Sequence, residues 1–175
     1  MKTLILGLLL AFVTSATFAQ KESKDDKIIK DSEDAKAAFL KDDPSMSDLF
    51  SSAYGYVILP NVGKGGLGVG GASGNGTAYQ GGALVGFAKM TQVTVGFQAG
   101  GQAYSEVVFF ETQEAFDRFK ANKIEMSAQV SAVAAKSGAS ANAKYVDGVA
   151  VFTRTKGGLM YEASVGGQKF KYEDK

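Results

Sequence analysis

The sequence predicts an α+β fold: a curved, glycine-rich and mainly antiparallel sheet, or partial barrel, with two N-terminal helices and one short internal helix. The sheet is predicted by the stretch from Tyr54 to Gly101, which holds 15 of the chain's 22 glycines. Apolar side chains alternate between these glycines, as in Val93, Val95 and Phe97, and a period of two is typical of strands. Glycine inside a strand marks a bulge, a bend or a close approach of two backbones, so we expect strong curvature. Amphipathic segments on either side of this stretch predict the helices.

The first 19 residues are predicted to be a secretory signal peptide. Lys2 precedes an apolar run from Leu4 to Val13, and Thr17-Phe18-Ala19 fits the small-x-small pattern of a cleavage site. The run is too short for a membrane span, and a retained N-terminal anchor is the alternative. Cleavage between Ala19 and Gln20 would make the protein periplasmic or secreted. The chain has no cysteine, which excludes a disulfide framework and a lipid-modified cysteine.

About 156 residues follow the cleavage site, the size of one ordinary domain. We expect residues 20–30 to be a flexible, charged N-terminus and residues 31–175 to form the domain. Without Lys2 the basic and acidic residues are equal in number. This neutrality argues against a nucleic-acid partner, because nucleic-acid-binding domains normally carry a strong basic excess.

Two helices are predicted before the sheet. Asp31 or Ser32 can cap a helix that runs through Lys41. Pro44 suits the first position of a second helix. Its apolar residues form one stripe, which we expect to pack on the sheet: Met46, Leu49, Phe50 and Ala53. The alternative is insertion into a bilayer surface, which requires a basic polar face, whereas the polar face here is acidic.

The strands predicted in the glycine-rich stretch are Tyr54–Leu59, Leu67–Ala72, Thr77–Gln80, Ala83–Lys89 and Gln92–Gln98. A hairpin turn is expected at Ser73-Gly74-Asn75-Gly76, whose residues tolerate positive φ. A buried strand is predicted from Tyr104 to Phe110, and Thr112 can cap a short helix, Gln113–Asn122. The later strands predicted are Glu125–Ala135 and a three-stranded meander of Val149–Thr155, Leu159–Val165 and Lys169–Tyr172.

The residue types argue against catalysis. The chain has no histidine and no cysteine, which removes the commonest general base, the thiol nucleophile and most transition-metal ligands. A Ser-Lys or two-carboxylate mechanism stays open in principle, but no acidic residue lies between Leu49 and Ser105. The pairs Asp25-Asp26 and Asp42-Asp43 lack the spaced oxygen ligands of a calcium loop. We therefore expect no enzyme, no metal site and no cofactor.

One motif, from Gly63 to Gly68, fits the dinucleotide-binding pattern G-x-G-x-x-G and follows a predicted strand. That fingerprint needs a helix next and an acidic residue about 20 positions on, whereas the next acidic residue here is Glu106. Gly65 also stands where a P-loop has Ser or Thr. The motif is therefore interpreted as structural, through Gly63, Gly65, Gly66, Gly68, Gly70 and Gly71.

Basic residues are the candidates for contacts with lipid headgroups. Arg154 and Lys156 are two apart on one predicted strand, as are Lys169 and Lys171 on another, so the members of each pair share a face. Near an anionic surface each contributes about 1 kcal/mol. The alternative is a solvated outer face. The complete candidate set is Lys64, Lys89, Arg154, Lys156, Lys169 and Lys171.

The run from Ala53 to Gly76, A-Y-G-Y-V-I-L-P-N-V-G-K-G-G-L-G-V-G-G-A-S-G-N-G, resembles the start of the SYLF domain. Further matches follow in order at Val95–Gly101, Ser105–Phe110, Thr153–Leu159 and Val165–Gly167. The resemblance covers roughly Asp31 to Phe170. It implies one α+β domain that binds membrane lipids, with phosphoinositides as ligands and actin binding in some eukaryotic members. Bacterial members are typically small exported proteins.

Together these observations predict an exported, non-enzymatic, lipid-binding protein. The expected partner is a phospholipid or a membrane surface, with an envelope protein as a further candidate partner. The alternatives are an envelope structural or interaction protein and a small outer-membrane β-barrel, whose strands should run about 9 to 11 residues between aromatic girdles.

Overall fold

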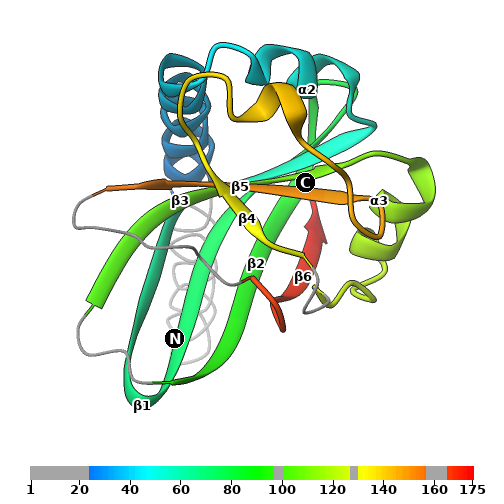
Figure 1. Cartoon of the computed structure of the whole chain (residues 1–175). Coiled ribbons are helices and arrows are strands. Elements are labelled where there is room, and N and C mark those ends of the chain that lie inside the picture. The colour runs from blue at the N-terminus through cyan, green and yellow to red at the C-terminus, as the bar shows by residue number, and fades with distance from the viewer. Residues whose placement is uncertain (1–23, 97–100, 127–129, 157–164) are drawn as a thin grey trace, which may run out of the picture.

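The computed structural model describes residues 24–96, 101–126, 130–156 and 165–175 (Figure 1). The predicted signal peptide lies outside these residues. The chain is helical over residues 24–42, called here the N-terminal helix. The elements that follow are α2 (Met46–Ser52), β1 (Gly55–Gln80), β2 (Ala83–Gly96), β3 (Gly101–Phe110), α3 (Gln113–Lys120), β4 (Ala132–Ala134), the 3-10 helix η1 (Ser140–Asn142), β5 (Val149–Thr155) and β6 (Lys169–Asp174).

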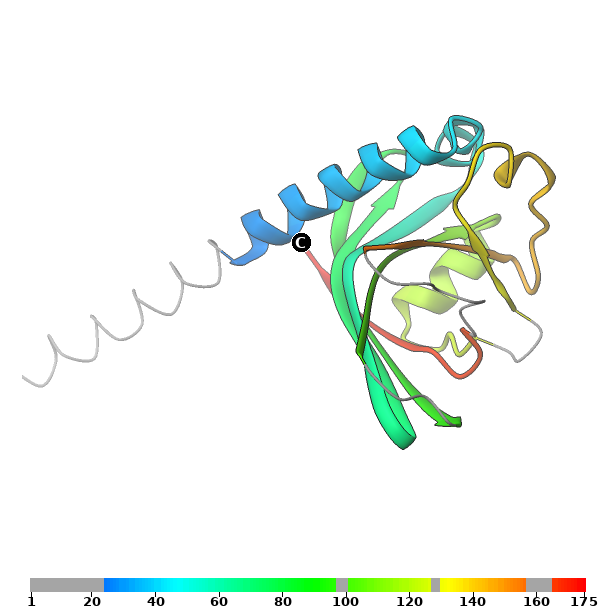
Figure 2. The ribbon, with the colours of Figure 1, turned by 60° about the vertical axis from the view of Figure 1, so that its left-hand side comes forward.

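The strands form one curved, open sheet in the order β4-β5-β3-β1-β2-β6 (Figures 1 and 2). All neighbouring strands are antiparallel except β4 and β5, which are parallel. An isolated bridge joins Glu125 to Lys169 at the start of β6, and Ala132–Ala134 pairs with β5. Glu125 thus lies beside β6 at one edge of the sheet, and β4 forms the other edge. The predicted α+β class and the mainly antiparallel sheet are confirmed.

Strand β1 is long because it folds back on itself. Its first arm pairs with β3 from Gly55 to Gly65, and its second arm pairs with β2 from Gly68 onward. The two arms lie side by side in Figures 1 and 2. Their backbones are so close that a Cβ added at Gly76 would overlap the carbonyl oxygen of Ile58 in the opposite arm. The chain therefore reverses within the glycine motif at residues 65–68.

The predicted hairpin turn at residues 73–76 is wrong. These residues lie in mid-strand and pair with Thr91, Met90, Lys89 and Ala88 of β2. Their glycines serve the close approach of the two arms of β1, a requirement that local turn propensity cannot distinguish from a turn. The turn into β2 is instead Gly81-Gly82, where both residues have positive φ.

Apolar side chains are buried on both faces of the sheet. On the inner face, Phe116 and Phe119 of α3 are fully buried, as predicted, and the Phe116 ring lies 5.5 Å from that of Phe110 in β3. Thr112 caps α3 as expected, since its Oγ1 accepts a hydrogen bond from the backbone N–H of Ala115. With both faces covered, β3 is buried from residue 104 to residue 110, which confirms the predicted buried strand.

The outer face is covered by the N-terminal helix and α2. Phe39 of the helix is fully buried, and the Phe50 ring of α2 lies 4.9 Å from the Phe109 ring of β3. The predicted packing of the second helix on the sheet is therefore confirmed. The first helix, however, is already present at residue 24, in the segment predicted to be flexible. Two (i, i+4) ion pairs, Lys27–Asp31 and Lys30–Asp34, support it there.

The predicted C-terminal meander is wrong. Strand β5 lies between β4 and β3, whereas β6 pairs with β2 at the far edge of the sheet. These two strands therefore do not pair with each other. The predicted middle strand lies almost entirely outside the described residues. Phe170 and Tyr172 of β6 join the inner core beside Phe119, and this long-range packing favours the distant edge over the nearer one.

Candidate lipid-binding cleft

A cleft of about 590 Å³ lies between the start of the N-terminal helix and the outer face of the sheet near β2 and β6. Its wall on the helix side comes from residues 24–29, which present Ile28 and Ile29. Its floor comes from the second arm of β1, from β2 and from β6. Phe87 of β2 is half-buried there, so the lining combines apolar and charged groups. The complete described lining is Lys24, Asp25, Asp26, Ile28, Ile29, Asn75, Gly76, Phe87, Ala88, Lys89, Lys171, Glu173, Asp174 and Lys175.

Two of the predicted basic residues meet in this cleft. Lys89 of β2 stands directly opposite Lys171 of β6, and Asn75 of β1 stands opposite Lys89 on its other side. Directly opposed residues share a face, so the two ammonium groups emerge together. Both lysines are exposed, and neither forms an ion pair or side-chain hydrogen bond with any described residue. Like charges directly opposite each other are unfavourable, which makes this pair a natural receptor for an anion.

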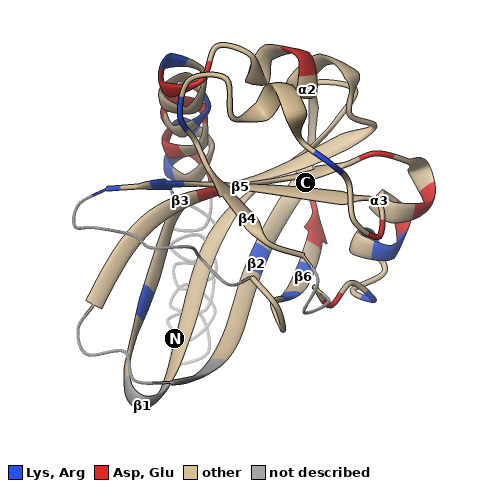
Figure 3. Cartoon of the chain, viewed as in Figure 1, with Lys and Arg blue, Asp and Glu red and all other residues tan. Residues whose placement is uncertain are grey.

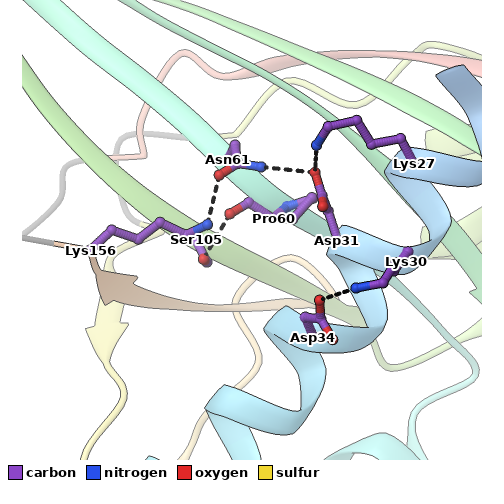
Figure 4. A network of polar contacts seen from close by, with 8 residues as sticks. All are labelled: Lys27, Lys30, Asp31, Asp34, Pro60, Asn61, Ser105 and Lys156. Atoms are coloured by element: carbon purple, nitrogen blue, oxygen red, sulfur yellow. Dashed lines mark hydrogen bonds and ion pairs between the residues drawn. The ribbon is translucent and has the colours of Figure 1, made fainter.

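The predicted residues of β5 do not join this pair. Arg154 forms an ion pair with Asp42 at the end of the N-terminal helix, with 2.5 Å between Nε and Oδ2. Lys156 donates a hydrogen bond to Oδ1 of Asn61 at 2.6 Å, and Nδ2 of Asn61 donates to Oδ2 of Asp31 (Figure 4). The Arg154–Asp42 and Asn61–Asp31 contacts join the N-terminal helix to the sheet. Arg154 and Lys156 thus each already have a polar partner within the protein.

The other two predicted cations are also separate from the pair. Nζ of Lys169 lies 3.5 Å from Oε2 of Glu125. Lys64 lies opposite Gln102, near the point where β1 folds back. The basic residues are spread over the elements, and the long arms of β1 and β2 carry few charges (Figure 3). The structure thus brings together two of the six predicted cations and disperses the rest. The six glycines of the predicted structural motif all lie on β1, around its fold-back.

A buried polar pair inside the sheet was not predicted. Glu106 of β3 is fully buried in the inner core, and its Oε2 accepts a hydrogen bond from Nε2 of Gln168 at 2.9 Å. Burial raises the pKa of Glu106 to about 7, although the hydrogen bond from Gln168 opposes the shift. The signal in the sequence is a lone acidic residue inside a predicted buried strand. Among the described residues the hydrogen-bond partner of this carboxyl is Gln168, a neutral amide, and we interpret the carboxyl as structural.

The acidic side chains and the helices of the described residues also bear on the type of site. The described residues contain no group of three or more acidic side chains placed to hold a metal ion. None of their helices is both long and apolar enough to span a bilayer. The chemistry that the cleft itself offers is anion binding by the opposed ammonium groups of Lys89 and Lys171.

Comparison with known proteins agrees with the resemblance. Residues 91–175 match the family model described as Ysc84, Las17-binding protein actin regulator. This part of the chain belongs to the Ysc84 (SYLF) family. The matched part of this chain includes Glu106, α3 and the whole of β6, and therefore Lys171. Lys89 and the N-terminal helix come before it.

One relative extends further toward the N-terminus. The chain is 29% identical over 141 residues to a protein of Aeromonas veronii named Beta cell expansion factor A. The similarity covers 75% of this chain and 50% of that protein, so the chain matches about half the length of this SYLF relative.

Proposed function

We propose that this SYLF protein is exported and binds membrane phospholipid through the cleft beneath its N-terminal helix. The observation that carries the proposal is that Lys89 and Lys171 stand directly opposite each other and have no ion-pair partner among the described residues. Two ammonium groups on one face suit a phosphate, and the apolar side chains of Ile28, Ile29 and Phe87 suit the adjoining part of a lipid. The resemblance to lipid-binding SYLF domains and the predicted signal peptide support the same reading.

No catalytic role is proposed. The cleft presents ammonium, carboxylate and amide groups, without histidine or cysteine to act as base or nucleophile. The description of the matched family names a protein ligand, Las17, but no described surface of this chain singles out a protein partner. Binding of lipid therefore stands as the function that the geometry supports best.

The proposal is tested by co-sedimentation of residues 20–175 with phospholipid vesicles. Replacing both lysines, in Lys89→Gln/Lys171→Gln, should weaken binding about 30-fold, because each basic residue near a lipid surface contributes about 1 kcal/mol. The matched control is Lys123→Gln/Lys144→Gln, which removes the same charge from two exposed lysines outside the cleft. Equal weakening by the two double variants, or no sedimentation of the parent protein with any vesicle, would contradict the proposal.

A further inference from the structure

The described lining of the cleft is electrically balanced. It contains four lysines and four carboxylates: Lys24, Lys89, Lys171 and Lys175 with Asp25, Asp26, Glu173 and Asp174. A ligand of purely negative charge would be attracted by one set and repelled by the other. Complementarity of charge at an interface selects the partner whose charges match those of the site in sign and position. A balanced cleft therefore favours a ligand that carries both signs.

The charges available to a ligand stand on different walls. On the sheet wall, Lys89 and Lys171 have no partner among the described residues, as shown above. On the helix wall, neither Asp25 nor Asp26 forms an ion pair or side-chain hydrogen bond within the described part of the chain. By contrast, Asp174 accepts a hydrogen bond from the Tyr172 hydroxyl and lies 3.8 Å from Nζ of Lys120. Among the described residues no ion pair spans the cleft. The two aspartates of the helix wall, beside Lys24, therefore face the two lysines of the sheet wall, beside Glu173.

We propose that the cleft recognises the headgroup of a zwitterionic phospholipid, with its phosphate at Lys89 and Lys171 and its ammonium group at Asp25 and Asp26. This assignment rests on the proposed lipid-binding function and names its ligand. A volume of about 590 Å³ is within the usual size of small-molecule sites. Ile28 and Ile29 follow the two aspartates by one turn of helix, so an apolar surface adjoins the charged one on the same wall.

The residues that line the cleft also favour a ligand with a primary ammonium group over one with a quaternary ammonium group. Quaternary ammonium groups are typically bound inside cages of several aromatic rings. The described lining contains one aromatic side chain, Phe87, and two carboxylates that can accept hydrogen bonds from an N–H group. The chemistry thus fits phosphatidylethanolamine better than phosphatidylcholine.

The test compares vesicles of phosphatidylcholine alone, phosphatidylcholine with phosphatidylethanolamine, and phosphatidylcholine with phosphatidylglycerol, at one salt concentration. We expect the ethanolamine vesicles to bind residues 20–175 at least ten-fold more tightly than the other two. Asp25→Asn/Asp26→Asn should reduce this binding at least ten-fold and leave binding to phosphatidylglycerol vesicles unchanged or stronger. Glu33→Gln/Asp48→Asn, which removes the same charge from exposed positions of the N-terminal helix and α2 outside the cleft, should bind like the parent protein.

The outcomes separate this inference from the function on which it rests. Binding to phosphatidylglycerol vesicles alone, unaffected by the aspartate variant, would overturn the headgroup assignment and leave lipid binding in place. No binding to any vesicle would overturn both. Soluble phosphoethanolamine that binds as tightly as the vesicles would identify a free metabolite as the ligand and overturn the assignment to a lipid.

Discussion

At the scale of single residues, Glu106 shows how a fold can tolerate an acid in its core. The carboxyl lies on the inner face of β3, where Oε2 accepts a hydrogen bond from Gln168 and Oε1 has no hydrogen-bond partner within the described part of the chain. Gln168 belongs to the turn at residues 165–168, which a second hydrogen bond also holds, from Nε2 of Gln92 to the carbonyl of Gly166 at 2.9 Å. The protonated form of Glu106 therefore suits the folded state, in keeping with its raised pKa.

This raised pKa predicts a pH dependence of stability. The pKa of Glu106 is about 7 in the folded protein against 4.5 for an unperturbed group, so the folded state binds more protons between these values. The free energy of unfolding should therefore fall as pH rises from about 4.5 to about 7, by on the order of 3 kcal/mol, and then level off. Glu106→Gln should abolish this fall and be the more stable protein at pH 8, as measured by urea unfolding at pH 5 and pH 8.

The control for this measurement is Glu111→Gln, an exposed acid one residue beyond the same strand. It should keep the pH dependence of the parent protein. If Glu106→Gln lost stability between pH 5 and pH 8 as steeply as Glu111→Gln, the carboxyl of Glu106 would not be the titrating group.

At the scale of elements, the fold depends on the reversal of β1. A strand can fold back on itself and keep both arms in one sheet only where the backbones approach without a side chain between them. Gly76 meets this requirement against Ile58, and Gly74 does so against Asn61, whose carbonyl oxygen would lie 2.9 Å from an added Cβ. Glycine costs strand stability elsewhere, so these positions explain part of the unusual composition of β1.

Gly76→Ala should therefore destabilise the protein strongly. The new methyl group would overlap backbone atoms of the opposite arm, and overpacking of this kind costs about 1–3 kcal/mol or more. Gly63→Ala is the matched control, because its Cβ would meet nothing within 4 Å, and it should be neutral or slightly stabilising. Thermal unfolding followed by circular dichroism measures both; comparable melting temperatures for the two variants would refute this account of β1.

At the scale of the whole molecule, the N-terminal helix joins parts of the sheet that lie far apart. At its C-terminal end Asp42 pairs with Arg154 of β5, and in its middle Lys36 donates to the Tyr56 hydroxyl of β1 at 3.0 Å. Its first described turns form one wall of the cleft over β2 and β6. Figure 2 shows the helix running along the outer side of the sheet. The helix is thus both a cover for the outer core and a part of the proposed site.

Removal of this helix should prevent stable folding. A chain of residues 43–175 would expose the outer-face core that Ala35 and Phe39 now cover, and exposed apolar surface of this kind promotes aggregation. We expect the shortened chain to bind a hydrophobic dye and to lose its cooperative thermal transition, whereas residues 20–175 should retain it. A shortened chain that unfolds cooperatively at the melting temperature of the longer one would show that the helix is dispensable.

Features that depend on neighbouring residues could be predicted from the sequence. Thr112 caps α3 and the stripe of α2 packs on the sheet, because caps and amphipathic stripes are local. The six candidate cations likewise include the two that line the cleft.

Only the tertiary structure decided how distant segments meet. The reversal of β1, the placing of β6 beside β2, the opposition of Lys89 to Lys171 and the burial of Glu106 each depend on strand register between residues far apart in sequence. A shift of register by one residue exchanges the two faces of a strand, so composition and periodicity alone cannot say which side chains share a face across a sheet. The sequence by itself therefore determined the kinds of element and the candidate residues, and tertiary packing selected which of them form a site.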